Sequence, residues 1–379
     1  MQSYLAFARA HESDIIALIR EMVECESPSF DAPAIDRFVE LVGDRLHGLA
    51  NVWTLPGGRF GRVLRCEFNL PGTEKDGQLL ALGHSDTVWS AGTLAGMPFR
   101  VEDGRLWGPG VLDMKSGIAF FMFAMRALQE LDRPVKRRVI MQLNPDEEVG
   151  SEASRPLTEE AGRESAAVLV LEPGTGMTGK LKTARKGVGD YTVTVKGRAS
   201  HAGVDFEAGA SAIIELARQI QRIAKFTQLD RGITVNPGVI SGGTRTNVVA
   251  AEARAEVDIR VLKMKDAPAL DRKFRSLKPV DERCSIHVEG GVNRPPMERS
   301  KRIQALFETA QNLAREIGVE LEESMTGGGS DGNFTAALGV ATLDGLGGVG
   351  EGAHAPNESI LVDRIADRTA LLAGLVEAL

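Results

Sequence analysis

The chain has 379 residues, of which 45 are basic and 52 acidic, so its formal net charge is −7. This mild acidity argues against nucleic-acid binding, which normally needs a basic face large enough to shift the whole balance. The length predicts two or three domains, and no stretch reaches the ~18 uninterrupted apolar residues of a membrane span. Cys25, Cys66 and Cys284 form neither a disulfide framework nor a CxxC pair, so we expect packing roles in a cytoplasmic protein.

Helices and strands alternate in the first half of the chain. Helices are predicted over 14–25, 35–50 and 116–131, and strands over 62–70, 78–84, 137–144 and 166–173. A polar helical stretch follows Ser151. Strands that are apolar at nearly every position and alternate with helices indicate an α/β fold, with a mostly parallel sheet and helices on both faces.

From about Gly187 the pattern changes to that of a small sandwich. The order is strand, helix, two strands, helix and strand, over 189–198, 207–226, 233–243, 247–262, 267–277 and 283–290. This order is typical of a ferredoxin-like α+β domain. A Gly- and Pro-rich linker at 290–296 ends it, and helices are predicted again over 301–318 and 363–379. We therefore predict an α/β domain of residues 1–184 and 297–379, interrupted by an inserted domain of residues 185–296.

Two motifs place candidate metal ligands beside predicted strands or helices. GHSDTV puts His84 and Asp86 at the end of the strand 78–84, where open α/β sheets build their sites. His84 could bind a metal while Asp86 accepts its other N–H; the alternative is a simple turn. Asp113 lies in the Gly-rich GPGVLDMKSG, where a carboxylate could equally start the following helix.

Further carboxylates follow other strands. The NPDEEVGS motif holds Asp146, Glu147 and Glu148, which repel each other unless a cation lies among them or they point into water. Glu172 follows the strand 166–173 in LEP, and His354 lies in the Gly-rich GEGAHAPNE. Two histidines and several carboxylates suit a divalent cation such as zinc. Two metals need a bridging carboxylate, and the extra carboxylate of the Glu147–Glu148 pair supplies a general base.

Eight motifs in order resemble those of one enzyme family. GHSDTV, GPGVLDMKSG, PDEEVGS, LEP, GRASHAG, DIR, TGGGSD and GAHAPNE run from about residue 82 to 358. Together they resemble the co-catalytic zinc exopeptidase and aminoacylase family, and most of all its glutamate carboxypeptidase (carboxypeptidase G) branch. The resemblance implies a zinc-bearing α/β domain interrupted by a smaller dimerisation domain, and hence a homodimer.

The resemblance also implies a set of metal ligands. Asp113 would bridge two zinc ions, with manganese or cobalt as possible replacements. His84 and Glu172 would complete one site, and Glu148 and His354 the other. The peptide bond between Asp113 and Met114 would be cis.

The remaining implied roles concern catalysis and the substrate. Glu147 would be the general base and Asp86 would hold His84, while His201 would reach the partner subunit's active site to stabilise an oxyanion. Arg260 and Asn247 would hold the free carboxylate of the substrate. Thr326 and Gly329 would contact its backbone, and Lys180 would meet its acidic side chain.

These features predict hydrolysis of the amide bond to a C-terminal amino acid, with glutamate favoured, in a small N-acyl amino acid or short peptide. One alternative is a broader aminoacylase or deacetylase. Another is a metal-binding homologue without activity. Nucleotide binding by TGGGSDGN is a weak interpretation, because the P-loop lysine is missing.

Overall fold

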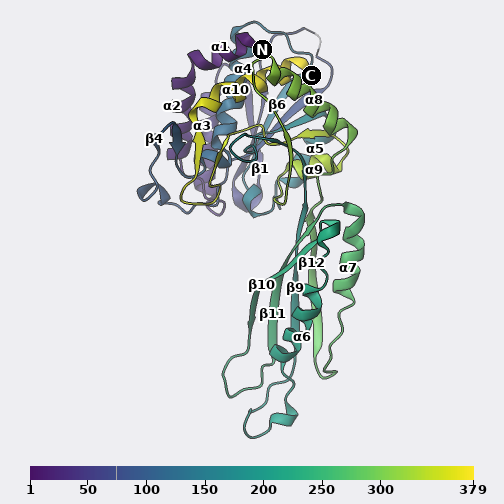
Figure 1. Ribbon diagram of the computed structural model, residues 1–379. Helices are drawn as coiled ribbons and strands as arrows, with labels where there is room; N and C mark the ends of the chain where they lie inside the picture. Colours follow the sequence, from purple (N-terminus) through teal and green to yellow (C-terminus); the bar gives the residue numbers. More distant parts are fainter. Residues whose placement is uncertain (74) are drawn as a thin grey trace. The chain divides into compact units, whose positions relative to one another are not determined.

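The computed structural model describes residues 1–73 and 75–379. The chain forms two compact units, which Figure 1 draws as ribbons. The first unit comprises Met1–Ala184, Arg299–Thr326 and Ser330–Leu379, and the second comprises Arg185–Glu298 and Gly327–Gly329. The second unit therefore ends at Glu298 and also takes in the three glycines of the TGGGSD motif.

A six-stranded sheet forms the centre of the first unit. Its strand order is β1 (Ala50–Pro56), β2 (Arg62–Phe68), β6 (Arg138–Asn144), β3 (Gln78–His84), β7 (Ser165–Val170) and β14 (Ala341–Leu343). From β6 to β14 every neighbouring pair is parallel, whereas β1 and β2 join the edge in antiparallel pairs. The predicted α/β fold with a mostly parallel sheet is confirmed.

Helices cover both faces of this sheet. Leu79 and Ala81 of β3 point into one apolar cluster, while the alternating Leu80 and Leu82 point into another that includes Ala161. The first cluster takes residues from most of the helices, and the second from α5. The helices are α1 (Gln2–Ala10), α2 (Glu12–Glu24), α3 (Ala32–Arg45), α4 (Ser116–Glu130), α5 (Arg155–Arg163), α8 (Lys301–Arg315), α9 (Gly332–Ala337) and α10 (Ile365–Ala378).

Helix α4 is buried on almost all sides because its sequence is apolar throughout. It begins directly after the loop that carries Asp113. At Gly117 a Cβ atom would lie 2.0 Å from the carbonyl oxygen of Leu171, so only glycine permits this approach. The start of α4 is thereby packed against the end of β7.

Smaller sheets complete the first unit. One has the antiparallel order β15 (Gly350–Glu351), β16 (Ser359–Leu361), β5 (Arg105–Trp107) and β4 (Arg100–Glu102). The other pairs β13 (Glu323–Thr326) with β8 (Leu181–Arg185). Strands of two to five residues are too short to show a recognisable alternation of apolar and polar residues, so the sequence did not predict them.

The second unit has the expected order of elements. These are β9 (Gly187–Lys196), α6 (Ala212–Ala224), β10 (Thr234–Gly242), β11 (Glu252–Val261), α7 (Ala267–Arg275) and β12 (Ser285–Arg294). The sheet order is β10-β11-β9-β12, with every pair antiparallel. Both helices pack on this sheet (Figure 1), since Leu216 and Phe274 share its apolar cluster.

The three cysteines are free thiols; Cys66 and Cys284 are buried and Cys25 is partly so. Within the described residues, no helix has both the length and the apolar character needed to cross a membrane.

Candidate metal centre

Three neighbouring parallel strands end where the candidate ligands begin. His84 is the last residue of β3, Glu148 lies just after β6, and Glu172 lies just after β7. Because β3 lies between β6 and β7 and is parallel to both, these side chains lie at one edge of the sheet. Two loops complete the set, with Asp113 before α4 and His354 between β15 and β16.

These five side chains form two groups that share Asp113. His84, Asp113 and Glu172 make one group, and Asp113, Glu148 and His354 make the other; within each group the donor atoms lie within 4.8 Å of one another. Asp113 Oδ1 lies 3.2 Å from His84 Nε2, and Asp113 Oδ2 lies 3.3 Å from His354 Nε2. Each carboxylate oxygen of Asp113 therefore faces one group, as a bridging ligand requires. The Asp113–Met114 peptide bond is cis, as expected.

The remaining contacts fit a pair of cations. His84 Nε2 lies 3.7 Å from Glu172 Oε1, and His354 Nε2 lies 3.2 Å from Glu148 Oε1. Three carboxylates crowded between two imidazoles repel one another unless positive charge lies among them. Nitrogen and oxygen donors in this mixture suit zinc and similar divalent metals.

The protonation of these groups reflects the same crowding. Hydrogen bonding to Asp113, and next to Glu148, raises the pKa of His354 to about 10. Burial alone would lower the pKa of His84, but hydrogen bonds to Asp113 and Asp86 outweigh it and raise that pKa well above its usual value. Burial raises the pKa of Glu148. A divalent cation binds the neutral imidazole, so it would compete with protons for these two histidines.

Asp86 lies fully buried behind His84. The Nδ1 atom of His84 is 2.8 Å from the backbone carbonyl oxygen of Asp86 and 3.4 Å from its carboxylate. A carbonyl oxygen only accepts hydrogen bonds, so Nδ1 carries the hydrogen and Nε2 is left to face the metal groups. Asp86 thus orients the ring, with its backbone making the shorter contact.

The Asp86 carboxylate also fixes the loop after β6. It accepts hydrogen bonds from the backbone N–H groups of Glu147 (3.1 Å) and Glu148 (3.2 Å) and from the hydroxyl of Ser29 (2.8 Å). The sequence did not point to Ser29, which lies 57 residues from Asp86. Glu147 is therefore anchored beside Glu148 although its carboxylate belongs to neither metal group.

Asp146 has a different place from its two acidic neighbours. Its side chain is buried and accepts a hydrogen bond of 2.7 Å from the backbone N–H of Ala153. It stabilises the turn that leads to α5 and belongs to neither metal group.

Four of the predicted substrate or catalytic residues lie in the second unit. The segments of His201 and Asn247 are joined by a hydrogen bond of 2.9 Å from the N–H of Ala202 to the carbonyl oxygen of Asn247. Arg260 donates through Nε (3.0 Å) and Nη2 (2.7 Å) to both carboxylate oxygens of Asp258, and its Nη1 lies 3.3 Å from the carbonyl oxygen of Gly327. Gly329 is the fourth, and a Cβ atom there would lie 2.9 Å from Arg294 Cδ.

The other two substrate candidates belong to the first unit. Lys180 is 40% exposed and forms an ion pair with Glu322. Thr326 is the last residue of β13.

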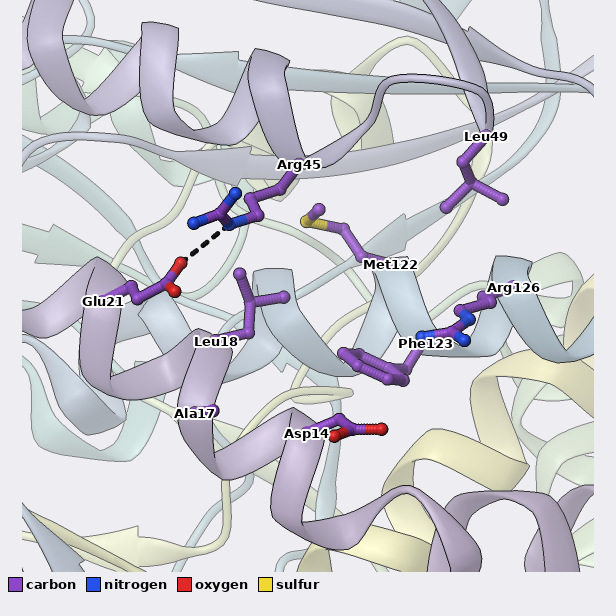
Figure 2. A pocket seen from close by; sticks show the side chains of 9 residues that line it. All are labelled: Asp14, Ala17, Leu18, Glu21, Arg45, Leu49, Met122, Phe123 and Arg126. Atoms are coloured by element: carbon purple, nitrogen blue, oxygen red, sulfur yellow. Dashed lines mark hydrogen bonds and ion pairs between the residues drawn. The ribbon is translucent and has the colours of Figure 1, made fainter.

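A cavity of about 240 Å³ lies elsewhere in the first unit, among α2, α3 and α4. Figure 2 shows Glu21 and Arg45 joined across it by an ion pair of 2.7 Å, with Leu18 and Phe123 nearby. None of its lining residues belongs to either metal group.

Known proteins are similar to this chain in sequence and in fold. The model of peptidase family M20/M25/M40 matches residues 80–378, a range that contains all five residues of the two metal groups. Carboxypeptidase G2 of Pseudomonas sp. (strain RS-16) is 30% identical over 304 residues, which cover 79% of this chain and 73% of that protein. A succinyl-diaminopimelate desuccinylase of Rhodospirillum centenum is 28% identical over 398 residues, covering 96% and 97% of the two chains.

The crystal structure of aminopeptidase PepT from Bacillus cereus has the same fold. It matches with a TM-score of 0.80 at 24% identity, over 97% of this chain and 98% of that one. The chain belongs to peptidase family M20/M25/M40, and it is a metal-binding hydrolase of the peptidase and amidohydrolase type.

Proposed function

We propose that this M20-family hydrolase uses two zinc ions to cleave the amide bond between an acyl group and a C-terminal amino acid, with glutamate favoured. The observation that carries the proposal is the pair of metal groups that share Asp113, with Glu147, a member of neither group, next to Glu148. Likeness to carboxypeptidase G2 supports the choice of a C-terminal amino acid.

In the proposed reaction, His84 and Glu172 would hold one metal, Glu148 and His354 the other, and Asp113 both. The two cations would polarise the scissile carbonyl and lower the pKa of the attacking water. Glu147 takes the proton from that water and passes it to the leaving amide nitrogen, so the nitrogen departs as an amine.

Substrate recognition is proposed for the residues that carry matching charges. Arg260 and Asn247 would hold the free carboxylate, and the fork that Arg260 already forms with Asp258 keeps its guanidinium in a fixed orientation. Lys180 would meet the acidic side chain of glutamate. Its ion pair with Glu322 reduces this charge, so we expect a preference for glutamate and not an absolute requirement.

Thr326 and Gly329 would contact the substrate backbone, and His201 would stabilise the oxyanion from the other subunit of a homodimer. We place the protein in the cytoplasm, where its free thiols would stay reduced.

The second unit offers a surface for that dimer. Strand β10 is at the edge of the sheet, where Val239 and Ile240 are 56% and 65% exposed. Ile213 and Ile214 of α6 are 46% and 52% exposed, and Ile213 and Ile240 line one apolar cavity. An unpaired edge strand with apolar side chains favours pairing with a second copy.

The experiment that tests the proposal is release of free amino acid from a panel of N-acylated amino acids, with zinc-loaded protein and with a chelator. Release that the chelator abolishes and that favours N-acyl-glutamate supports the proposal. Chelator-sensitive release with another preference would support the alternative, a broader N-acyl-amino-acid hydrolase, for which the desuccinylase relative is the observation in favour. No release with two metals bound would indicate a homologue without activity.

A further inference from the structure

A buried carboxylate outside both metal groups contacts the loop that carries Asp113. Glu358 has no exposed surface and lies four positions after His354, directly before β16. The 110–113 loop is distant in sequence, yet it lies against this side chain.

Glu358 accepts four hydrogen bonds, two at each carboxylate oxygen. Its Oε1 accepts from the backbone N–H groups of Leu112 (2.9 Å) and Asp113 (3.0 Å). Its Oε2 accepts from the backbone N–H of Gly110 (2.8 Å) and from the indole N–H of Trp89 (2.8 Å). Three donors therefore belong to one short loop, which these bonds hold in a single conformation.

The same residue connects this loop with the one that carries His354. The backbone N–H of Glu358 donates to the carbonyl oxygen of Ala355 (2.9 Å), which closes the turn after His354. Ser359 then pairs with Trp107 of β5, just before the 110–113 loop. Glu358 thus lies where the two loops meet.

We propose that Glu358 is a positioning residue, which fixes the bridging ligand Asp113 and the ligand His354 relative to each other before any metal binds. A carboxylate suits this place because each of its oxygens accepts two hydrogen bonds. A glutamine side chain has the same shape, but its NH₂ group cannot accept hydrogen bonds. In either orientation of the amide, that NH₂ group would face two of the four N–H donors. The proposal rests on the metal ligands of the proposed function.

The test compares Glu358→Gln with a matched variant in the second unit. Glu215 is also fully buried and accepts from two backbone N–H groups, those of Val280 (2.9 Å) and Asp281 (3.1 Å), and from the side chain of Gln219 (2.6 Å). Glu215→Gln therefore makes the same chemical change where no member of either metal group lies.

The first readout is the affinity for Zn²⁺, measured by competition with a chelator at a temperature where both variants are folded. We expect ~10–100-fold weaker binding for Glu358→Gln, as for other residues that hold a metal ligand, and unchanged binding for Glu215→Gln. Wild-type affinity in Glu358→Gln would overturn the proposal.

The second readout needs no variant, so it applies even if Glu358→Gln does not fold. Backbone amide exchange of Gly110, Leu112 and Asp113 is measured in the metal-free wild-type protein. We expect these amides to stay protected, because the carboxylate and not the metal holds them. Exchange as fast as in an unstructured peptide would overturn the proposal. A wild-type protein that binds no zinc would instead refute the proposed function, and the exchange result would still decide the part of Glu358.

Discussion

Replacing Glu147 with glutamine should abolish most of the turnover and leave both metals in place. The carboxylate of Glu147 belongs to neither metal group, and its backbone N–H stays hydrogen-bonded to Asp86 at 3.1 Å whatever its side chain is. The substitution therefore removes the proposed proton acceptor and alters no member of either metal group. General bases contribute ~10²–10⁴-fold to rate, which corresponds to ~2.7–5.4 kcal/mol of the barrier.

The assay measures kcat on N-acyl-glutamate together with the zinc content of the same preparation. Glu148→Gln is the first control, because it alters a member of a metal group and should lower the zinc content. Glu152→Gln is the second, since that side chain is 75% exposed and pairs only weakly with Arg59 at the surface. Turnover of Glu147→Gln within ~10-fold of wild type, with two zinc ions bound, would refute the assignment of Glu147 as the base.

The exposure of the two metal groups, the contacts of Arg260 and the exposed edge of β10 each lead to a further prediction. Partial chelation should first remove the metal of the Glu148–His354 group, because the His354 side chain is 49% exposed whereas that of His84 is 1% exposed. Measuring the metal content together with the residual activity checks this, and simultaneous loss of both metals would contradict it. Arg260→Lys keeps the positive charge but loses the planar guanidinium that can donate two parallel hydrogen bonds to a carboxylate, so KM for N-acyl-glutamate should rise ~10-fold or more with little change in kcat. An unchanged KM would count against binding of the substrate carboxylate by Arg260. Ile240→Lys places a charge on the β10 edge and should convert the proposed dimer to monomers in sedimentation experiments, with Val52→Lys on β1 of the first unit as the control. A stable Ile240→Lys dimer would exclude this interface.

The sequence was sufficient to predict that the candidate ligands at strand ends lie close together, as the structure places them. The strands ending at His84 and before Glu172 are apolar at nearly every position, as expected where both faces are covered. Neighbouring parallel strands have their carboxyl ends at the same edge of the sheet. Polar residues that directly follow these two strands are therefore expected to lie close together. Residue type and strand direction alone made this prediction possible.

The different positions of the three consecutive acidic residues after β6 could not be predicted from the residues alone. Asp146, Glu147 and Glu148 have the same charge and follow one another, and nothing in their order shows which one faces a metal. The structure separates them through backbone contacts, because Asp146 turns to the N–H of Ala153 while Asp86 accepts from the N–H groups of the other two. The outcome depends on the turn, whose geometry leaves no periodic pattern.

The positions of Ser29 and Glu358 show why other residues near the centre were missed. A metal selects for histidine and carboxylate side chains, so its ligands stand out by type. The partners of Glu358 are mostly backbone N–H groups, which every residue except proline supplies, so the Asp113 loop shows no matching residue type. Glu358 itself is visible in the sequence only as one more acid in GAHAPNE. A residue that contacts a proposed metal ligand through the backbone thus becomes apparent only when both loops are seen together, and the exchange measurement on Gly110, Leu112 and Asp113 addresses that contact directly.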